Sequence, residues 1–139
     1  MFEITHLHPV LVHFPVALII VGFLADISSL VFKKEKCLST MGLYLEVLGL
    51  LGAIAAFITG HFMTGDTLDG AGHIGQMHEL FATLTVCTIF IAVLFRFLII
   101  YLKIDTSNLK YIATAIFFFA FIFVAITGHF GGMIVYGNL

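Results

Sequence analysis

Histidines are the residues of this chain best suited to chemistry, because imidazole nitrogens bind metal ions and haem iron. The 139-residue sequence contains seven of them. Two belong to a repeated five-residue sequence, ITGHF, which occurs at Ile58–Phe62 and again at Ile126–Phe130. The histidines of the two copies, His61 and His129, are 68 residues apart. A repeat of this kind predicts a function that needs two equivalent histidines.

A second histidine pattern is repeated over almost the same distance. His8 and His13 are separated by four residues, and so are His73 and His78, which lie 65 residues further along the chain. Internal repeats in membrane proteins commonly place a binding site between the two halves. We therefore interpret the chain as two helical hairpins of one plan. Each has two histidines on its first helix and a Thr-Gly-His sequence on its second.

Bis-histidine ligation of haem b is the chemistry that fits paired histidines best. Helical bundles hold such cofactors between facing helices, with imidazole nitrogens as the axial ligands of the iron. Two hairpins would supply two histidine pairs, so we predict two haems b per chain. The predicted axial ligands are His13, His61, His78 and His129. Gly60 and Gly128, each just before a predicted ligand, would let a flat porphyrin lie close to the backbone.

His8 and His73 have two interpretations. Residues i and i+5 lie about 140° apart around a helix, so His8 and His13 cannot both face one porphyrin. His8 and His73 would bind the haem propionates, because the sequence offers no Lys or Arg near them, or one of them would itself be an axial ligand. The spacing leaves open which histidines share an iron.

The elements that must position these histidines are membrane-spanning helices. Hydrophobic residues make up 61% of the chain and charged residues 10%, whereas soluble domains average about 25% charged. Four apolar stretches are each long enough to cross a hydrocarbon core of about 30 Å, and only helices satisfy the backbone there at this length. The sequence therefore predicts an all-α integral membrane protein with one four-helix transmembrane domain over residues 1–139. The expected helices are at about 9–32, 41–63, 78–102 and 111–130, with His129 at the end of the fourth.

Basic residues lie on one side of this predicted topology. All six fall in or beside the first and third connections: Lys33, Lys34, Lys36, Arg96, Lys103 and Lys110. The positive-inside rule then places these connections in the cytoplasm and both termini outside, which is the periplasm for a bacterial inner membrane. All seven histidines fall on the outer side. The net charge of −2 and the lack of a basic patch argue against nucleic acid as a partner.

Three charged residues fall within the inner half of the predicted helices: Asp26, Glu46 and Arg96. Charged groups at membrane depth are costly and usually pair with one another. We expect a buried ion pair between Glu46 and Arg96. A proton route that serves quinone chemistry is the alternative interpretation.

Two stretches resemble the ends of a known family. HPVLVHFPVAL at His8–Leu18 and TGHFGGMIVYG at Thr127–Gly137 are similar to the two ends of domain-of-unknown-function family 2231, a family of small four-helix bacterial membrane proteins. The resemblance covers nearly the whole chain. Some members are similar to dihaem cytochromes b that exchange electrons with quinone, and superoxide oxidation has been attached to such proteins. The resemblance, with His13 and His78 present, implies the haem-binding branch.

These observations predict a dihaem membrane cytochrome b that transfers electrons at the periplasmic face. Its expected donor is periplasmic, with superoxide as a candidate, and its expected acceptor is membrane quinone. A non-haem zinc or copper site, for metal binding or transport, would also use clustered histidines. A non-catalytic membrane anchor subunit is the third hypothesis. The sequence leaves the oligomeric state open and is compatible with a homo-oligomer.

Overall fold

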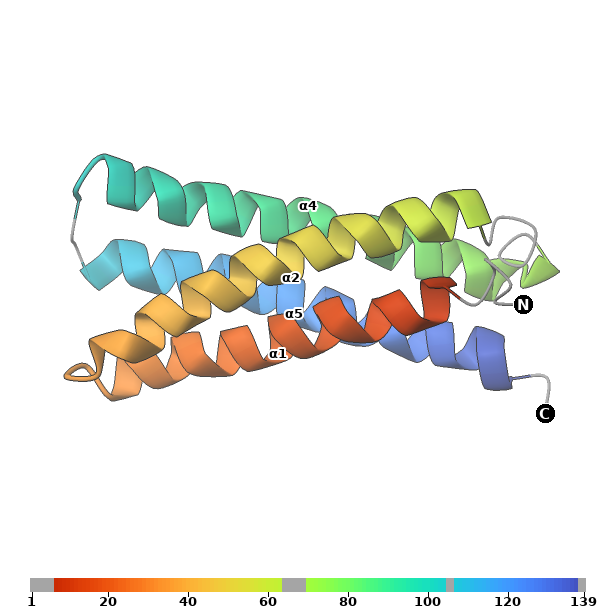
Figure 1. Cartoon of the computed structure of the whole chain (residues 1–139), viewed down its shortest axis with the longest axis horizontal. Helices are drawn as coiled ribbons and strands as arrows, with labels where there is room; N and C mark the ends of the chain where they lie inside the picture. Colours follow the sequence, from red (N-terminus) through yellow and green to blue (C-terminus); the bar gives the residue numbers. More distant parts are fainter. Residues whose placement is uncertain (1–6, 64–69, 105–106, 138–139) are drawn as a thin grey trace.

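Four long helices run side by side as a bundle (Figure 1). The structure, a computed structural model, describes residues 7–63, 70–104 and 107–137. The helices are α1 (Leu7–Val31), α2 (Lys36–Met63), α4 (His73–Tyr101) and α5 (Ser107–Tyr136). Each is long and apolar enough to cross a membrane, and the described residues contain no strand. The predicted all-α, four-helix transmembrane class is therefore confirmed.

The last helix is longer than the sequence predicts. α5 continues to Tyr136, so the expectation that His129 ends this helix is wrong. Two glycines, Gly131 and Gly132, follow the predicted end at about residue 130, and glycine often ends a helix in soluble proteins. Glycine is well tolerated in transmembrane helices, however, and an apolar segment follows these two glycines. His129 therefore lies two turns before the end of α5.

The helices form two hairpins. α1 packs along α2 and α4 packs along α5, while smaller contacts join α2 to α4 and α1 to α5. α1 and α4 thus lie diagonally across the bundle. We call the end where α1 and α4 begin, and where α2 and α5 finish, the histidine end. The opposite end, at residues 32–35 and 102–104, is the lysine end (Figure 1).

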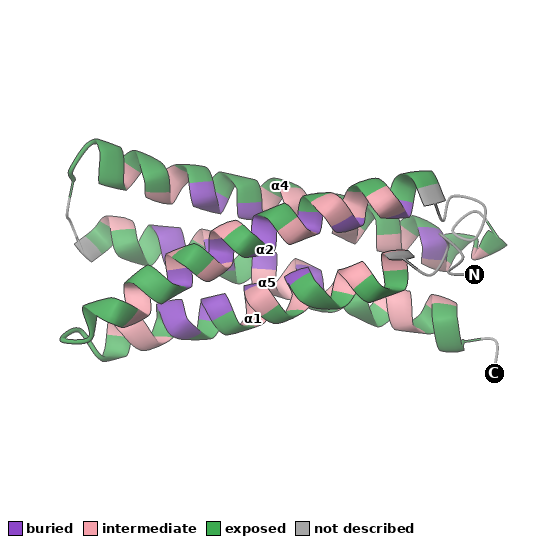
Figure 2. Ribbon diagram, viewed as in Figure 1, coloured by how far each residue is buried: buried purple, intermediate pink, exposed green. Residues whose placement is uncertain are grey.

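An apolar core fills the middle of the bundle. Ile19, Ile89 and Phe117 are fully buried there, and the ring of Phe23 meets the ring of Phe117 edge-on at 5.9 Å. Buried positions lie along the inward sides of the helices and exposed positions along the outward sides (Figure 2). Many exposed side chains are large and apolar, as expected of a surface in contact with lipid.

Burial relates the first helices of the two hairpins by an offset that differs from the 65-residue histidine spacing, and the second helices by the 68-residue offset of the Thr-Gly-His repeat. On the first helices, positions 70 residues apart are buried together: Pro15 with Thr85, Ile19 with Ile89, and Phe23 with Val93. On the second helices the offset is 68 residues, as in Glu46 with Thr114 and Ala56 with Val124. The offset of 70 makes His78 the counterpart of His8. The burial pattern therefore does not follow the alignment of His78 with His13 that the 65-residue spacing predicts.

Candidate functional site

A cavity of about 850 Å³ lies between the four helices at the histidine end. Its volume is within the range of about 300–1,000 Å³ that is typical of cofactor and ligand pockets. Small and apolar residues make up most of its wall, including Ala53, Ala56, Ala82 and Val124. Four of the seven histidines also line it: His8, His13, His61 and His78. We call this the histidine cavity.

His8 faces the histidine cavity from the first turn of α1 and is half-buried. Its Nδ1 atom lies 3.2 Å from Oγ1 of Thr59 on α2. The Thr59 hydroxyl itself donates to the carbonyl oxygens of Ala55 and Ala56, each at 3.0 Å. The Thr59 oxygen can therefore accept a hydrogen bond from Nδ1–H of His8. This hydrogen bond orients the imidazole.

His78 occupies the matching place in the second hairpin. It is half-buried near the start of α4, and its Nδ1 lies 3.0 Å from the backbone oxygen of Thr127 on α5. A carbonyl oxygen can only accept, so Nδ1 carries the hydrogen and Nε2 is the basic nitrogen. Histidines that bind metals usually donate their second ring N–H to an acceptor of this kind.

The other two histidines of the cavity are more exposed. His13 keeps its ring in place within α1, with Nδ1 2.6 Å from the backbone oxygen of Pro9. His61 lies in the last turn of α2 with its ring edge-on to Phe62, at 5.3 Å between centroids. Three of the four histidines in the cavity therefore have Nδ1 engaged with an oxygen acceptor.

The remaining predicted histidines lie apart from this group. His73 is the first residue of α4 and His129 lies on α5 beside Phe130, and both side chains are exposed. Neither is among the residues that line the histidine cavity. His6 falls outside the described residues. The structure thus brings His13, His61 and His78 together with His8, and leaves His129 outside the group.

The two predicted glycines differ in their surroundings. A Cβ on Gly60 would lie 2.9 Å from Cε1 of His8, so the close approach at this glycine is made by an imidazole of the chain itself. A Cβ on Gly128 would have no atom within 4 Å, although Gly128 also lines the cavity. Gly60 therefore makes room for His8, while Gly128 leaves open space in the cavity wall.

Gly60→Ala is expected to leave the cofactor-free protein about 1–3 kcal/mol less stable than Gly128→Ala, because both variants gain helix propensity and only Gly60→Ala carries the cost of overpacking. The added methyl group would displace the His8 ring and break its contact with Thr59. Thermal unfolding in detergent would measure the change. Gly128→Ala is the matched control, because its methyl group meets open space. Equal effects of the two substitutions would contradict this account.

The threonines of the repeated Thr-Gly-His sequence are site residues that the sequence analysis overlooked. Thr59 contacts His8 through its hydroxyl oxygen, and Thr127 contacts His78 through its backbone oxygen. Thr127 also places its hydroxyl 3.4 Å from that of Thr85. The signal was the repeat itself, in which the threonine recurs as faithfully as the histidine.

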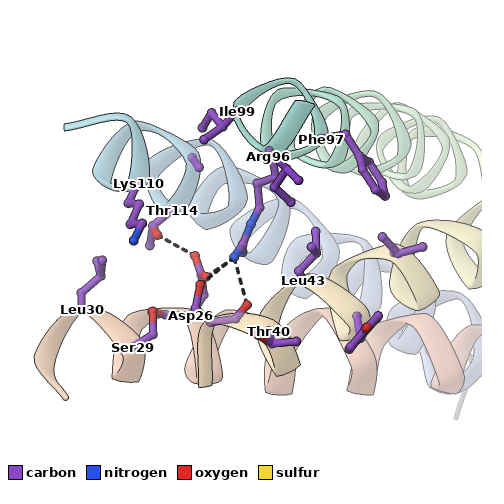
Figure 3. Close-up of a pocket in the computed structure, with 15 residues that line it drawn as sticks. Asp26, Ser29, Leu30, Thr40, Leu43, Arg96, Phe97, Ile99, Lys110 and Thr114 are labelled. Carbon is purple, nitrogen blue, oxygen red and sulfur yellow. Dashed lines mark hydrogen bonds and ion pairs between the residues drawn. The ribbon is translucent and has the colours of Figure 1, made fainter. Parts of the chain in front are cut away.

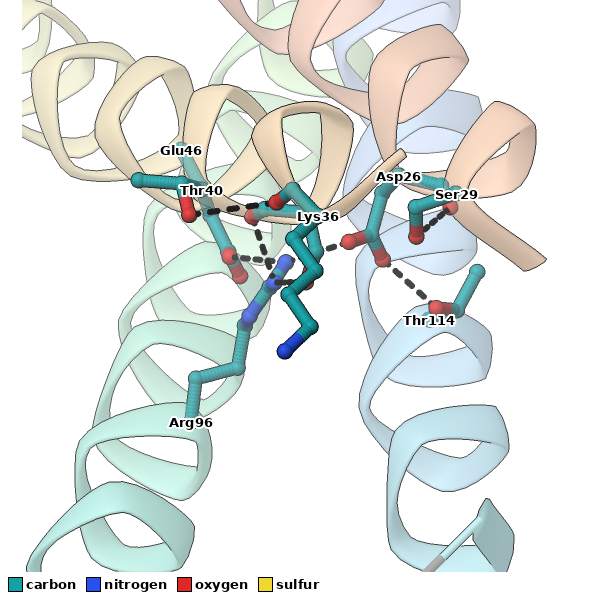
Figure 4. Close-up of polar contacts among 8 residues, drawn as sticks. Asp26, Ser29, Lys36, Thr40, Glu46, Arg96 and Thr114 are labelled. Carbon is teal, nitrogen blue, oxygen red and sulfur yellow. Dashed lines mark hydrogen bonds and ion pairs between the residues drawn. The ribbon is translucent and has the colours of Figure 1, made fainter. Parts of the chain in front are cut away.

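A polar cluster lies near the lysine end (Figure 4). Nη1 of Arg96 lies 2.6 Å from Oδ1 of Asp26 and 3.3 Å from Oε2 of Glu46. Its Nη2 donates to the backbone oxygen of Ser39 at 3.1 Å, and the Thr114 hydroxyl donates to Oδ2 of Asp26 at 2.5 Å. The predicted pairing of Glu46 with Arg96 is confirmed, and Asp26 is the closer partner of the arginine.

The apolar core separates this cluster from the histidine cavity. On α1, Ile19 lies between Pro15 of the cavity wall and Asp26 of the cluster. Ile89 holds the equivalent place on α4 and Phe117 on α5. The protein therefore has two polar regions, one toward each end of the bundle, with a layer of fully buried apolar side chains between them.

Comparison with known proteins gives one family. The profile of a family described as "predicted membrane protein (DUF2231)" matches residues 5–138, which is almost the entire chain. No curated protein and no solved structure matches the chain.

Proposed function

Because this chain belongs to the DUF2231 family, whose description gives a membrane location and no activity, we propose from the site itself that it binds haem b and carries electrons. The observation that carries the proposal is the pair His8 and His78. They stand on diagonal helices, line one cavity, and each has Nδ1 engaged with an oxygen of the neighbouring helix. This arrangement leaves Nε2 as the ring nitrogen to bind iron.

The residues of the histidine cavity fit the cofactor in other respects. The wall is mostly apolar, and Gly128 and Gly132 would each leave space even with a Cβ, so a flat macrocycle can lie against α5. Four histidines line the cavity, and two bis-histidine haems need four axial ligands. We therefore propose two haems per chain, with His8 as an axial ligand instead of His129.

The reaction we propose is electron transfer from a periplasmic donor, with superoxide as the candidate, to quinone in the bilayer. Haem b held by two imidazoles supplies one-electron exchange and leaves no open position for oxygen. The apolar wall of the cavity would give the cofactor a surrounding of low polarity, and the hydrogen-bond partners of His8 and His78 hold their rings in place. The distribution of Lys and Arg supports an orientation with the histidine end outside the cytoplasm, which would be the periplasm for a bacterial inner membrane.

The test is a reduced-minus-oxidised absorption spectrum of the detergent-purified protein, made with haem available. We expect a low-spin b-type spectrum and two haems per chain. A colourless protein would contradict the proposal. Bound zinc or copper in that preparation would favour a metal-binding or transport protein, and a preparation without metal or haem would favour a membrane anchor subunit.

A further inference from the structure

The polar cluster near the lysine end contains more acidic than basic groups. Asp26 and Glu46 both contact a single guanidinium, that of Arg96. Asp26 has the better of the two positions, because its Oδ1 makes the shorter contact with Arg96 and its Oδ2 accepts the hydroxyl of Thr114. The charge of Asp26 therefore balances that of Arg96. A negative charge on Glu46, the second carboxylate, would not be balanced by this guanidinium.

Glu46 lies at a position where an unbalanced negative charge is strongly unfavourable. Its side chain is fully buried, and Oε1 has no hydrogen-bond partner among the described residues. Among the described residues, the contact that Glu46 makes with the cluster is the longer one, 3.3 Å from its Oε2 to Nη1 of Arg96. An ionised carboxylate that is buried without full pairing is unfavourable by several kcal/mol in general, and such groups usually take up a proton instead.

Two lysines of the described residues lie near the cluster: Lys36 of α2, which Figure 4 labels, and Lys110 of α5. Lys110 of α5 lines a cavity of about 440 Å³ that also contains Asp26, Arg96 and Thr114 (Figure 3). Its side chain is exposed, so solvent at the lysine end shares in balancing its charge. Glu46 does not line this cavity, and the charges that act on Glu46 are those of Arg96 and Asp26.

We propose that Glu46 is a proton-binding site: a neutral carboxylic acid that completes the charge balance of Asp26 and Arg96 and exchanges its proton with the lysine end. The cavity of about 440 Å³ is lined by exposed Lys110 of the lysine end as well as by Asp26 and Arg96, and Arg96 contacts Glu46 directly. The core residues Ile19, Ile89 and Phe117 close the way toward the histidine cavity. The site therefore loads and unloads from one side.

Infrared spectroscopy of the full chain in lipid bilayers tests this proposal without any need for haem. At neutral pH we expect the carbonyl-stretch band of a protonated carboxylic acid, shifted by ¹³C-glutamate and by transfer to D₂O. Glu46→Gln should remove the band while keeping the thermal unfolding midpoint, because glutamine has the shape of the neutral acid. Glu35→Gln, at an exposed glutamate of the lysine end, should leave the band in place.

Three results would overturn the protonation of Glu46. The first is the lack of a protonated-carboxyl band at neutral pH, and the second is a band that persists in Glu46→Gln. The third is a Glu46→Gln protein that unfolds or does not fold, because this would mean that an ionised Glu46 is needed to pair with Arg96. A band that does not shift in D₂O would overturn the access through the cavity. None of these outcomes depends on whether the histidine cavity binds haem.

Discussion

His78→Ala is expected to remove a haem from the purified protein. The imidazole of His78 faces the histidine cavity, and its Nδ1–H is held by the carbonyl of Thr127, so Nε2 is the nitrogen we assign to iron. Loss of an outer-shell partner alone weakens metal binding by about 10–100-fold, so loss of a ligand should weaken it by more than about 100-fold. Haem titration of the cofactor-free protein, followed by absorption, measures the change.

Gln76→Ala is the matched control for this experiment, because Gln76 lies on the same turn of α4 and is exposed outside the cavity lining. Two further variants separate the ligand sets. If the four histidines of the cavity are the ligands, His8→Ala should lose a haem and His129→Ala should keep both. The reverse result would favour the set predicted from the repeat. Unchanged haem content in both His8→Ala and His78→Ala would contradict the proposed site.

Arg96→Met is expected to be the most destabilising single substitution near the lysine end. It removes the arginine from a buried Asp26 carboxylate, which keeps the hydrogen bond from the Thr114 hydroxyl. Removing one member of a buried ion pair typically costs about 3–5 kcal/mol, because the other charge stays in an apolar environment. Equilibrium unfolding in mixed micelles measures the loss. Methionine keeps most of the length and apolar contacts of the arginine stem.

Lys34→Met serves as the control, because Lys34 is exposed at the same end of the bundle. Adding Asp26→Asn to Arg96→Met should recover much of the stability, since the uncompensated charge is then removed. This rescue should not need a change at Glu46, which we infer to be neutral already. A loss below about 1 kcal/mol in Arg96→Met would mean that water reaches the cluster freely, and would contradict its burial.

The membrane class and the number of helices followed from the sequence alone. Four apolar stretches of spanning length leave helices as the structure that satisfies the backbone in lipid, and no tertiary detail is needed for that conclusion. The pairing of Arg96 with an acidic residue was predictable for a similar reason, because a charge at membrane depth needs a partner and few candidates exist. The end of α5 was not predictable, because two glycines that often end a soluble helix lie inside a transmembrane one.

Only the tertiary structure decided which histidines face the cavity. These helices are apolar around most of their circumference, so the sequence pattern does not identify the side of each helix that turns inward. Spacing within a helix sets the angle between two side chains, but the rotation of that helix against its neighbours is set by packing between helices. That rotation brings His8 and His78, 70 residues apart, to matching places beside Thr59 and Thr127. It also gives Arg96 a closer contact with Asp26 than with Glu46, which no spacing in the sequence records.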